Sequence, residues 1–502
     1  MVALTVDPIC QGERFQILKQ DGTPATRGGT TTHTLFAAGA MLAGTSTVAY
    51  EAWDNIRSLD YLISRPEVIA DKIGCTGTSG GGTQTHFLMA LDDRIAVAAP
   101  SCAQADRGRT SCGCQILAGV RAAGIRPSDY SALFAPKPLL MLAGRKDYIR
   151  INSVRRLYHQ VKDVYTALGH ADCVDLFESE DKHGLHKSHR QAVVRWMRRW
   201  FLNDNEVVVE PDSLIIQKDE DLWVTGTGQV GSNWKNVVNV AELNLERARQ
   251  LSSEREKFRK EHTRDEYLAE IKRLIGIRDR RCKPVAKSAG TIQRKGYCIE
   301  KIVIHRKGEV PVPGLLFLPE GKPGRLPAVL YVDGRGKSAA AGPDGPIARL
   351  VSEGRVVLAI DVRGFGETAD DPEGVNRFGL RRNAKKYWNN EYGNAFDAIV
   401  LGRPLLGQRV EDILAAFDVL AARKDVNPGS INLTGIGHAG PVALHAAALD
   451  SRIAGVTIQK SIKSWVEVVA APLSHDNLTH VVPFALTRYD LPDLVQAISP
   501  GP

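Results

Sequence analysis

Residues 73–92 read IGCTGTSGGGTQTHFLMALD, and this stretch predicts the fold of the first part of the chain. A strand-like run over residues 72–76 enters Gly-Thr-Ser-Gly-Gly at 77–81, and an apolar stretch without proline, expected to be a helix, follows. A Gly-x-Ser-x-Gly turn between a strand and a helix is typical of a nucleophile elbow, whose backbone is strained and whose serine hydroxyl stands clear of the sheet. The alternative is a packing turn of small residues. Ser79 is therefore a candidate nucleophile, and the N–H of Gly80 a candidate oxyanion donor.

An acid and a base follow the serine in the expected order. The buried-strand pattern at residues 138–143 leads to Asp147, and the strand-like run at 173–178 leads to His183. An amphipathic helix is expected after it, over residues 191–201. Residues at the carboxyl ends of parallel strands meet at one edge of the sheet. The order Ser, Asp, His is the one used by enzymes with this elbow, so we predict a triad of Ser79, Asp147 and His183.

Each of these residues has a simpler interpretation. Asp147 could cap the turn that follows its strand, as loop aspartates often do. His183 could be a solvated loop histidine, and His186 is the reserve candidate for the base. The order of the three residues along the chain, each at the end of a strand, favours the triad.

Several longer segments carry a family resemblance. They are residues 7–14 (DPICQGER), 65–68 (RPEV), 77–82 (GTSGGG), 89–95 (MALDDRI) and 223–230 (WVTGTGQV). Together they resemble bacterial α/β-hydrolases of the acetyl xylan esterase-like group. The resemblance implies a serine esterase that acts on acyl esters, such as those of acetylated plant polysaccharide.

The chain also repeats itself. Residues 54–96 align without a gap on residues 412–454, so that LDDRIA at 91–96 falls on LDSRIA at 449–454. Near the start, Asp7, Gly12 and Glu13 match a second set of the same residues, at 361, 366 and 367. Such self-similarity predicts two α/β-hydrolase-like units in tandem.

The second copy lacks the nucleophile, because Ser79 falls on Gly437. The string GIGHAG at 435–440 also matches a dinucleotide-binding fingerprint, which would require an acidic residue at the end of the next strand. That strand, expected over residues 453–459, ends in Lys460 and Ser461 instead. The repeat explains the glycines, so we expect no nucleotide cofactor and a loop or helix-start position for His438.

The two copies differ at their ends. The second has strand-like runs at 302–305, 314–318 and 328–333 ahead of its Asp361 strand, whereas the first opens directly at residues 2–6, read as a strand. Conversely, only the first has the strands that deliver an Asp and a His. The predicted fold is two doubly wound α/β sheets, the first lacking its N-terminal strands and the second its C-terminal strands. We expect a fragment of a longer protein; the alternative is that residues 328–333 pair beside the strand that delivers Ser79.

Three regions are predicted: a catalytic domain over residues 1–205, a hairpin and charged helical linker over 206–290, and a degenerate domain over 291–502. The linker has leucines at helical spacing among interleaved charges at 244–281, which indicates one or two solvated helices. The net charge of +8 is spread along the chain and indicates no nucleic-acid partner. No apolar run is long enough to span a bilayer, and residues 1–4 lack the features of a signal peptide.

The eight cysteines show no spacing typical of zinc. Cys102, Cys112 and Cys114 form the one cluster, expected to have no chemical role, so neither a metal nor an organic cofactor is expected. The predicted function is a serine carboxylic-ester hydrolase that deacetylates a carbohydrate ester, with a small-molecule or polysaccharide substrate. The alternatives are a serine peptidase of the prolyl-oligopeptidase kind, and a non-catalytic degenerate hydrolase that binds glycans.

Overall fold

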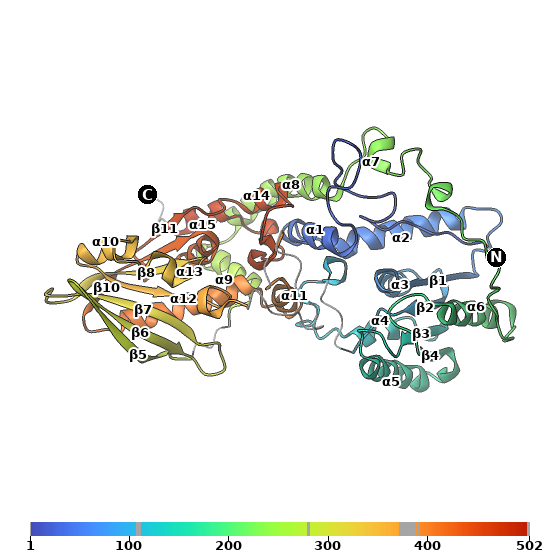
Figure 1. Cartoon of the computed structure of the whole chain (residues 1–502), viewed down its shortest axis with the longest axis horizontal. Helices are drawn as coiled ribbons and strands as arrows, with labels where there is room; N and C mark the ends of the chain where they lie inside the picture. The colour runs from blue at the N-terminus through green and yellow to red at the C-terminus, as the bar shows by residue number, and fades with distance from the viewer. Residues whose placement is uncertain (1, 107–111, 279–281, 371–386, 389–390, 499–502) are drawn as a thin grey trace. The chain divides into compact units, whose positions relative to one another are not determined.

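The computed structural model describes residues 2–106, 112–278, 282–370, 387–388 and 391–498 (Figure 1). The chain folds as two compact units, residues 1–37 with 46–240 and residues 38–45 with 241–502. Each unit has its own β-sheet flanked by helices, parallel in the first and mixed in the second. The chain is thus an α/β protein. Within the described residues, no helix combines the length and the apolar character needed to cross a bilayer.

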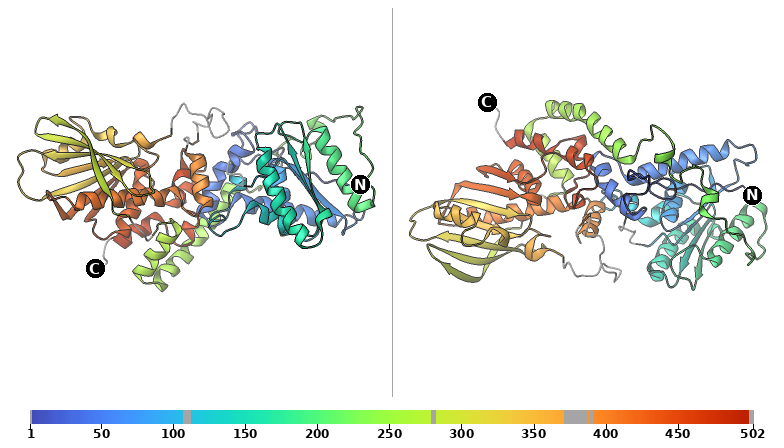
Figure 2. Two further views of the ribbon diagram at one scale, coloured as in Figure 1. Left: turned by 90° about the horizontal axis from the view of Figure 1, so that it is seen from below. Right: turned by 45° about the horizontal axis from the view of Figure 1, so that its top comes forward.

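The sheet of the first unit contains four parallel strands in the order of the sequence. They are β1 (Ile73–Thr78), β2 (Ile95–Ser101), β3 (Leu139–Gly144) and β4 (Val174–Ser179). The helices α3 (Gly80–Leu91), α4 (Pro127–Ala132), α5 (Ile151–Ala167) and α6 (Lys187–Leu202) connect or follow them (Figure 2). Because all four strands run the same way, their carboxyl ends lie at one edge of the sheet.

Alternating side chains of the strands build two apolar cores, one on each face of this sheet. Leu139 and Met141 pack on one face with residues of α3 and α5. Leu140 and Leu142 pack on the other face with Val193 and other residues of α6. Since β3 is buried on both faces, it reads in the sequence as a continuous apolar run.

The start of the first unit differs from the prediction. Residues 2–7 form no strand, since none of the strands in the described part of the chain pairs with them, and residues 2–5 are exposed. The helices α1 (Thr30–Leu42) and α2 (Thr47–Ile63) precede the sheet. Within the described residues, β1 pairs with β2 alone, so β1 is the edge strand.

The second unit has a seven-stranded mixed sheet with the order β11-β10-β8-β9-β7-β6-β5. The strands are β5 (Val285–Arg294), β6 (Tyr297–His305), β7 (Val312–Pro319), β8 (Leu326–Asp333), β9 (Val356–Ile360), β10 (Val426–Ile436) and β11 (Gly455–Gln459). The pairs β5–β6, β6–β7 and β7–β9 are antiparallel, and the others are parallel. The alternative in which residues 328–333 pair beside β1 is wrong, because β8 lies between β9 and β10.

The helices of the second unit include α10 (Pro346–Ser352), α11 (Tyr392–Val400), α12 (Leu405–Ala421), α13 (Gly440–Leu449), α14 (Trp465–Ala470) and α15 (Leu491–Ile498). α10 packs through Ile347 and Val351 on Val329 and Tyr331 of β8. α12 and α13 lie against one another and against β10.

The stretch between residues 206 and 290 departs in part from the expected hairpin and linker. Its helices are α7 (Val230–Asn233), α8 (Val240–Glu261) and α9 (Arg264–Leu274), and no hairpin is formed among the described residues of 206–284. The segment after Trp223 is instead held by Glu13, whose buried carboxylate accepts hydrogen bonds from the N–H groups of Val224 and Thr225 at 2.7 and 2.8 Å. α9 is not a solvated helix either, since it buries Tyr267, Leu268, Ile271 and Leu274.

Similar turns occur in both units at positions that the sequence repeat aligns and, for Cys102 and Lys460, at the same spacing just beyond the aligned segments. Three pairs of residues have nearly the same positive φ: Ser79 (57°) and Gly437 (60°), Cys102 (49°) and Lys460 (52°), Gly12 (52°) and Gly366 (54°). Two arginines also bind matching carboxylates: Arg94 binds Asp60 and Asp92, and Arg452 binds Asp418 and Asp450.

Candidate active site

Ser79 lies between β1 and α3 in a strained conformation. Its φ of 57° and ψ of −114° are unusual for a residue with a side chain. Its N–H donates to the carbonyl of Ser101 at 3.0 Å, and its carbonyl accepts from the N–H of Thr83 at 3.0 Å. Its hydroxyl makes no capping hydrogen bond to α3. The backbone therefore fixes the turn and leaves the hydroxyl available for chemistry.

The neighbouring glycines let the elbow close. A Cβ at Gly77 would lie 2.5 Å from the backbone of Gly81, and a Cβ at Gly82 would lie 2.6 Å from the carbonyl oxygen of Ser101. A Cβ at Gly81 would meet nothing within 4 Å. The turn therefore requires glycine at 77 and 82, whereas Gly81 contributes its close-packed backbone. Gly80 is the first residue of α3, where N–H groups have no partner inside the helix.

Asp147 follows β3, and its side chain is 2% exposed. One carboxylate oxygen accepts the N–H of Ile149 at 2.9 Å, and the other lies 2.8 Å from Nδ1 of His183. Burial alone would raise the pKa of Asp147, but the hydrogen bonds from His183 and Ile149 outweigh it, so the pKa lies below its ordinary value. Asp147 is thus a carboxylate at neutral pH, and it fixes the orientation of the His183 ring.

His183 lies in the loop between β4 and α6. Because Nδ1 donates to Asp147, the neutral ring presents the lone pair of Nε2, as a general base requires. Nε2 lies 3.5 Å from the hydroxyl of Tyr148, a distance typical of a weak hydrogen bond at best. The two rings also contact one another, with their centroids 4.5 Å apart.

Two loops must approach closely to join Asp147 and His183. The N–H of Arg145 donates to the carbonyl of Ser179 at 2.7 Å, and that of Lys146 donates to the carbonyl of Asp181 at 3.1 Å. A Cβ at Gly144 would lie 2.5 Å from the carbonyl oxygen of Asp181, so only glycine fits without moving a loop.

A half-buried carboxylate on β4 helps to hold this arrangement in place. Glu178, on β4, accepts hydrogen bonds from Arg155 at 2.6 and 2.7 Å and from Arg145 at 2.8 Å. The hydrogen bonds from Arg155 and then Arg145 outweigh the effect of burial and lower the pKa of Glu178 to about 2. The ion pairs connect the start of α5 to the end of β4.

Cys102 is a neighbour of this site that the motif did not single out. It follows β2 with a φ of 49°, and its Sγ lies within 4.8 Å of ligand atoms of both Asp147 and His183. Burial, before any other cause, raises the pKa of its thiol, which makes it an unreactive neighbour. The signal that could have found it is its position at the end of a strand of the same parallel sheet.

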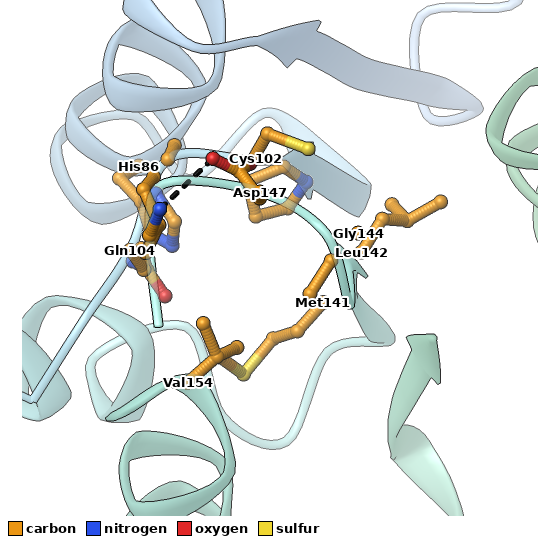
Figure 3. Close-up of a pocket in the computed structure, with 12 residues that line it drawn as sticks. His86, Cys102, Gln104, Met141, Leu142, Gly144, Asp147 and Val154 are labelled. Carbon is orange, nitrogen blue, oxygen red and sulfur yellow. Dashed lines mark hydrogen bonds between the residues drawn. The ribbon is translucent and has the colours of Figure 1, made fainter. Parts of the chain in front are cut away.

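A small cavity lies next to the acid. Figure 3 shows Cys102, His86, Gln104 and Asp147 around it. Neither Ser79 nor His183 lines this cavity. The cavity therefore adjoins Asp147 but does not reach the predicted nucleophile or base.

The structure brings some of the predicted residues together. Asp147 and His183 form a hydrogen-bonded pair, and Ser79 directly follows β1 of the same sheet. Within the described residues, no hydrogen bond joins the Ser79 hydroxyl to His183. Such bonds are often long in enzymes without substrate. His186, the reserve base, directly precedes α6, and its Nε2 is buried without a hydrogen-bond partner.

The equivalent turn of the second unit has no nucleophile. Gly437 is followed by His438, whose ring stacks on His480 with the centroids 4.8 Å apart. The pKa of His438 is lowered, chiefly by burial. Nearby, the carboxylate of Asp361 accepts a hydrogen bond from Nζ of Lys337 at 2.7 Å. Asp7 is the residue of the first unit that the sequence matches to Asp361. The second unit thus has a similar turn, with glycine where the first unit has Ser79.

Two side-chain groups of the described residues could hold a metal ion. One is Cys102 with Asp147 and His183, and the other is His33 with Cys112 and Cys114. The acid and the histidine of the first group already bind one another in the arrangement described above.

No protein-family model matches the chain. A curated protein of Bacillus subtilis (strain 168), named "Putative hydrolase YtaP", is 30% identical over 169 residues. The match covers 32% of this chain and 56% of that protein. The chain therefore spans about half the length of the curated relative that it matches.

Solved structures similar to the chain include several esterases. A "putative acetyl xylan esterase" of Bacteroides fragilis NCTC 9343 has a TM-score of 0.43 and 17% identity, with 56% of this chain and 76% of that chain covered. Acetyl Xylan Esterase 1 of Thermoanaerobacterium sp. JW/SL YS485 has a TM-score of 0.32 and 16% identity, with 47% and 75% covered. A glucuronoyl esterase of Solibacter usitatus has a TM-score of 0.34 and 14% identity, with 47% and 71% covered.

Proposed function

We propose that the first unit is a serine carboxylic-ester hydrolase with Ser79, His183 and Asp147 as its triad. The observation that carries the proposal is the strained Ser79 at the end of β1, on the same sheet edge as the hydrogen-bonded Asp147–His183 pair. The identity of 30% to a protein named as a hydrolase supports the same reaction class.

The proposed reaction proceeds through an acyl-enzyme. The Ser79 hydroxyl attacks the ester carbonyl while Nε2 of His183 takes its proton, and the proton then passes to the leaving alcohol. Asp147 keeps the ring in the required tautomer and stabilises the imidazolium. The N–H of Gly80 binds the developing oxyanion. Water, activated by His183, then releases the acid and restores Ser79.

The substrate that we propose is an acetyl ester of a carbohydrate, either a small molecule or a polysaccharide. This part rests on the sequence segments that resemble the acetyl xylan esterase-like group. We also propose that the second unit is a degenerate copy in tandem, supported by the aligned turns at Ser79 and Gly437 and by the matching arginine–carboxylate pairs.

Labelling of the full chain by a fluorophosphonate tests the nucleophile. We expect one label per chain, on the peptide that contains Ser79, and none in Ser79→Ala. Hydrolysis of p-nitrophenyl acetate, compared with peptide p-nitroanilides, separates an esterase from a peptidase of the prolyl-oligopeptidase kind. A folded chain that takes no label and hydrolyses neither substrate would favour the non-catalytic, glycan-binding alternative.

A further inference from the structure

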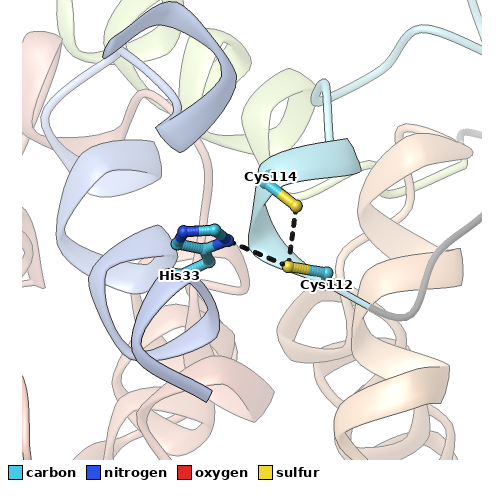
Figure 4. Close-up of side chains that lie close together, drawn as sticks. All are labelled: His33, Cys112 and Cys114. Carbon is cyan, nitrogen blue, oxygen red and sulfur yellow. Dashed lines mark hydrogen bonds between the residues drawn. The ribbon is translucent and has the colours of Figure 1, made fainter. Parts of the chain in front are cut away.

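A second cluster of reactive side chains lies in the first unit, outside the proposed triad. It contains His33 of α1, Cys112, which directly precedes the short helix η1 (Gly113–Gln115), and Cys114, which lies within that helix (Figure 4). The Sγ of Cys112 lies 3.5 Å from Nδ1 of His33 and 2.8 Å from the Sγ of Cys114. The three residues are 1–4% exposed. Two sulfurs and one ring nitrogen therefore converge away from solvent.

The ring of His33 is oriented as it is in metal sites. Its Nε2 lies 2.6 Å from the carbonyl oxygen of Ile9, and since a carbonyl can only accept, Nε2 carries the proton. A carboxylate oxygen of Glu51, with no hydrogen-bond partner of its own, lies 3.4 Å from the same nitrogen. Metal-binding histidines typically donate their second N–H to a carbonyl or carboxylate in this way. Nδ1, which faces the sulfurs, is left as the ligand atom.

The loop that carries the cysteines fits closely against α1. A Cβ at Gly113 would lie 2.3 Å from the carbonyl oxygen of His33 and 2.7 Å from the Cβ of Ala37. The N–H of Gly113 also donates to the hydroxyl of Thr34 at 3.4 Å. A glycine between the two cysteines thus lets both sulfurs reach the histidine.

We propose that His33, Cys112 and Cys114 bind a soft divalent cation of the zinc class. Thiolate and imidazole ligands are those that zinc prefers, and two thiolates balance the charge of the ion in a buried site. In a tetrahedral site with Zn–S bonds of about 2.3 Å the sulfurs would be about 3.8 Å apart, so binding would open the present pair by about 1 Å. A water molecule would complete the coordination.

A disulfide between the cysteines is the competing interpretation, and the site favours it less. Oxidation would consume both sulfur ligands and leave Nδ1 of His33 buried without a partner. An unsatisfied buried polar group is unfavourable. Binding of an ion satisfies Nδ1 and both sulfurs at once.

The ion would have a structural role near the nucleophile. The amide of Gln115 donates to the hydroxyl of Thr83 at 3.4 Å, and the carbonyl of Ser79 accepts from both the hydroxyl and the N–H of Thr83. The ion would therefore fasten α1 to a loop that contacts the first turn of α3. This proposal does not depend on the esterase reaction.

The test is metal binding by the full chain, freed of metal with a chelator under reducing conditions. We expect one equivalent of Zn²⁺ or Co²⁺ to bind, and the Co²⁺ form to show sulfur-to-metal charge-transfer absorption. Cys114→Ser should lose most of this absorption, whereas Cys173→Ser, a matched buried cysteine of the same unit, should retain it. Asp147→Asn should also retain it, because that residue belongs to the other possible site.

A second measurement needs no variant. Zn²⁺ should protect Cys112 and Cys114 of the folded wild-type chain from iodoacetamide at least tenfold, as measured by mass spectrometry of their peptide. The proposal is overturned if the folded, reduced chain binds no ion. It is also overturned if the Co²⁺ spectrum responds to Asp147→Asn and not to Cys114→Ser, or if the purified chain holds a Cys112–Cys114 disulfide that chelator and metal leave unchanged.

Discussion

The substitution Gly144→Ala should move Asp147 and His183 apart without changing either side chain. Gly144 ends β3 and has no positive φ, so alanine is acceptable to its backbone. The new Cβ would lie 2.5 Å from the carbonyl oxygen of Asp181 and 2.9 Å from that of Lys182. Both atoms belong to the backbone of the loop that carries His183, so the contact can be relieved only by moving one loop away from the other.

The size of the effect follows from these distances. An ordinary contact of about 3.4 Å requires a displacement of about 0.9 Å, and the 2.8 Å bond between His183 and Asp147 would lengthen beyond hydrogen-bonding range. Misplacement by about 1 Å costs about a hundredfold in rate. Overpacking of this kind lowers the free energy of unfolding by about 1–3 kcal/mol. We expect kcat/KM for p-nitrophenyl acetate to fall about a hundredfold in a chain that still folds.

Lys182→Ala is the matched control, since it changes an exposed side chain of the same loop and leaves its backbone in place. This control should retain wild-type kcat/KM, and thermal unfolding should show that both variants fold. If Gly144→Ala folds and keeps kcat/KM within threefold of the wild type, the argument that loop contact positions the catalytic pair is wrong.

The other predictions concern the triad, the second unit and the response to pH. Ser79→Ala should lower kcat more than about 10⁴-fold with little change in stability, because the turn does not use the hydroxyl. His183→Ala should lower kcat by about as much, whereas His186→Ala should lower it only slightly. A severe loss of kcat in His186→Ala alone would reassign the base. Gly437→Ser in the Ser79→Ala background should restore neither phosphonate labelling nor hydrolysis, because no strand follows β11 among the described residues, whereas in the first unit β3 and β4 lead to Asp147 and His183. Stoichiometric labelling would contradict this. Glu178, whose pKa is lowered to about 2, should stabilise the fold fully above pH ~4.5 and lose that contribution as the pH falls toward 2. Glu178→Gln should lower the free energy of unfolding by about 1–2 kcal/mol after allowance for the half-exposed arginines. In acid denaturation titrations this difference from the wild type should therefore disappear as the pH falls toward 2. A difference that does not depend on pH would refute this.

Part of the fold could be predicted because short patterns dictate it. The glycines around Ser79 permit one tight turn, and the uniformly apolar run of β3 is typical of a strand buried on both faces. The strands β1, β3 and β4 lie within two residues of their predicted positions. The residues at their carboxyl ends could be named because a parallel sheet gathers them at one edge.

Long-range packing could not be predicted in the same way. His33 and Cys112 are 79 residues apart, and no local spacing joins them, so the sequence does not indicate their contact. Residues 2–6 have the composition of a strand, yet a strand also needs a partner for its backbone, and none of the described strands pairs with them. The same limit applies to α9, whose buried face depends on what packs against it.

A comparison of the two units separates backbone strain found in both from strain that the proposed role of Ser79 would explain. At the end of β2 and of β11 both units place a residue with a side chain in the left-handed region, Cys102 and Lys460, so this turn is strained whether or not a catalytic pair is present. At the elbow the second unit has Gly437, which adopts the same φ without the cost of about 1–2 kcal/mol that a Cβ brings. In the first unit Ser79 has this φ together with a Cβ, and the strain remains. A strained residue persists only where the surroundings hold it and something is gained. In the first unit His183 and Asp147 lie at the same edge of the sheet as Ser79, and we propose that they use its hydroxyl.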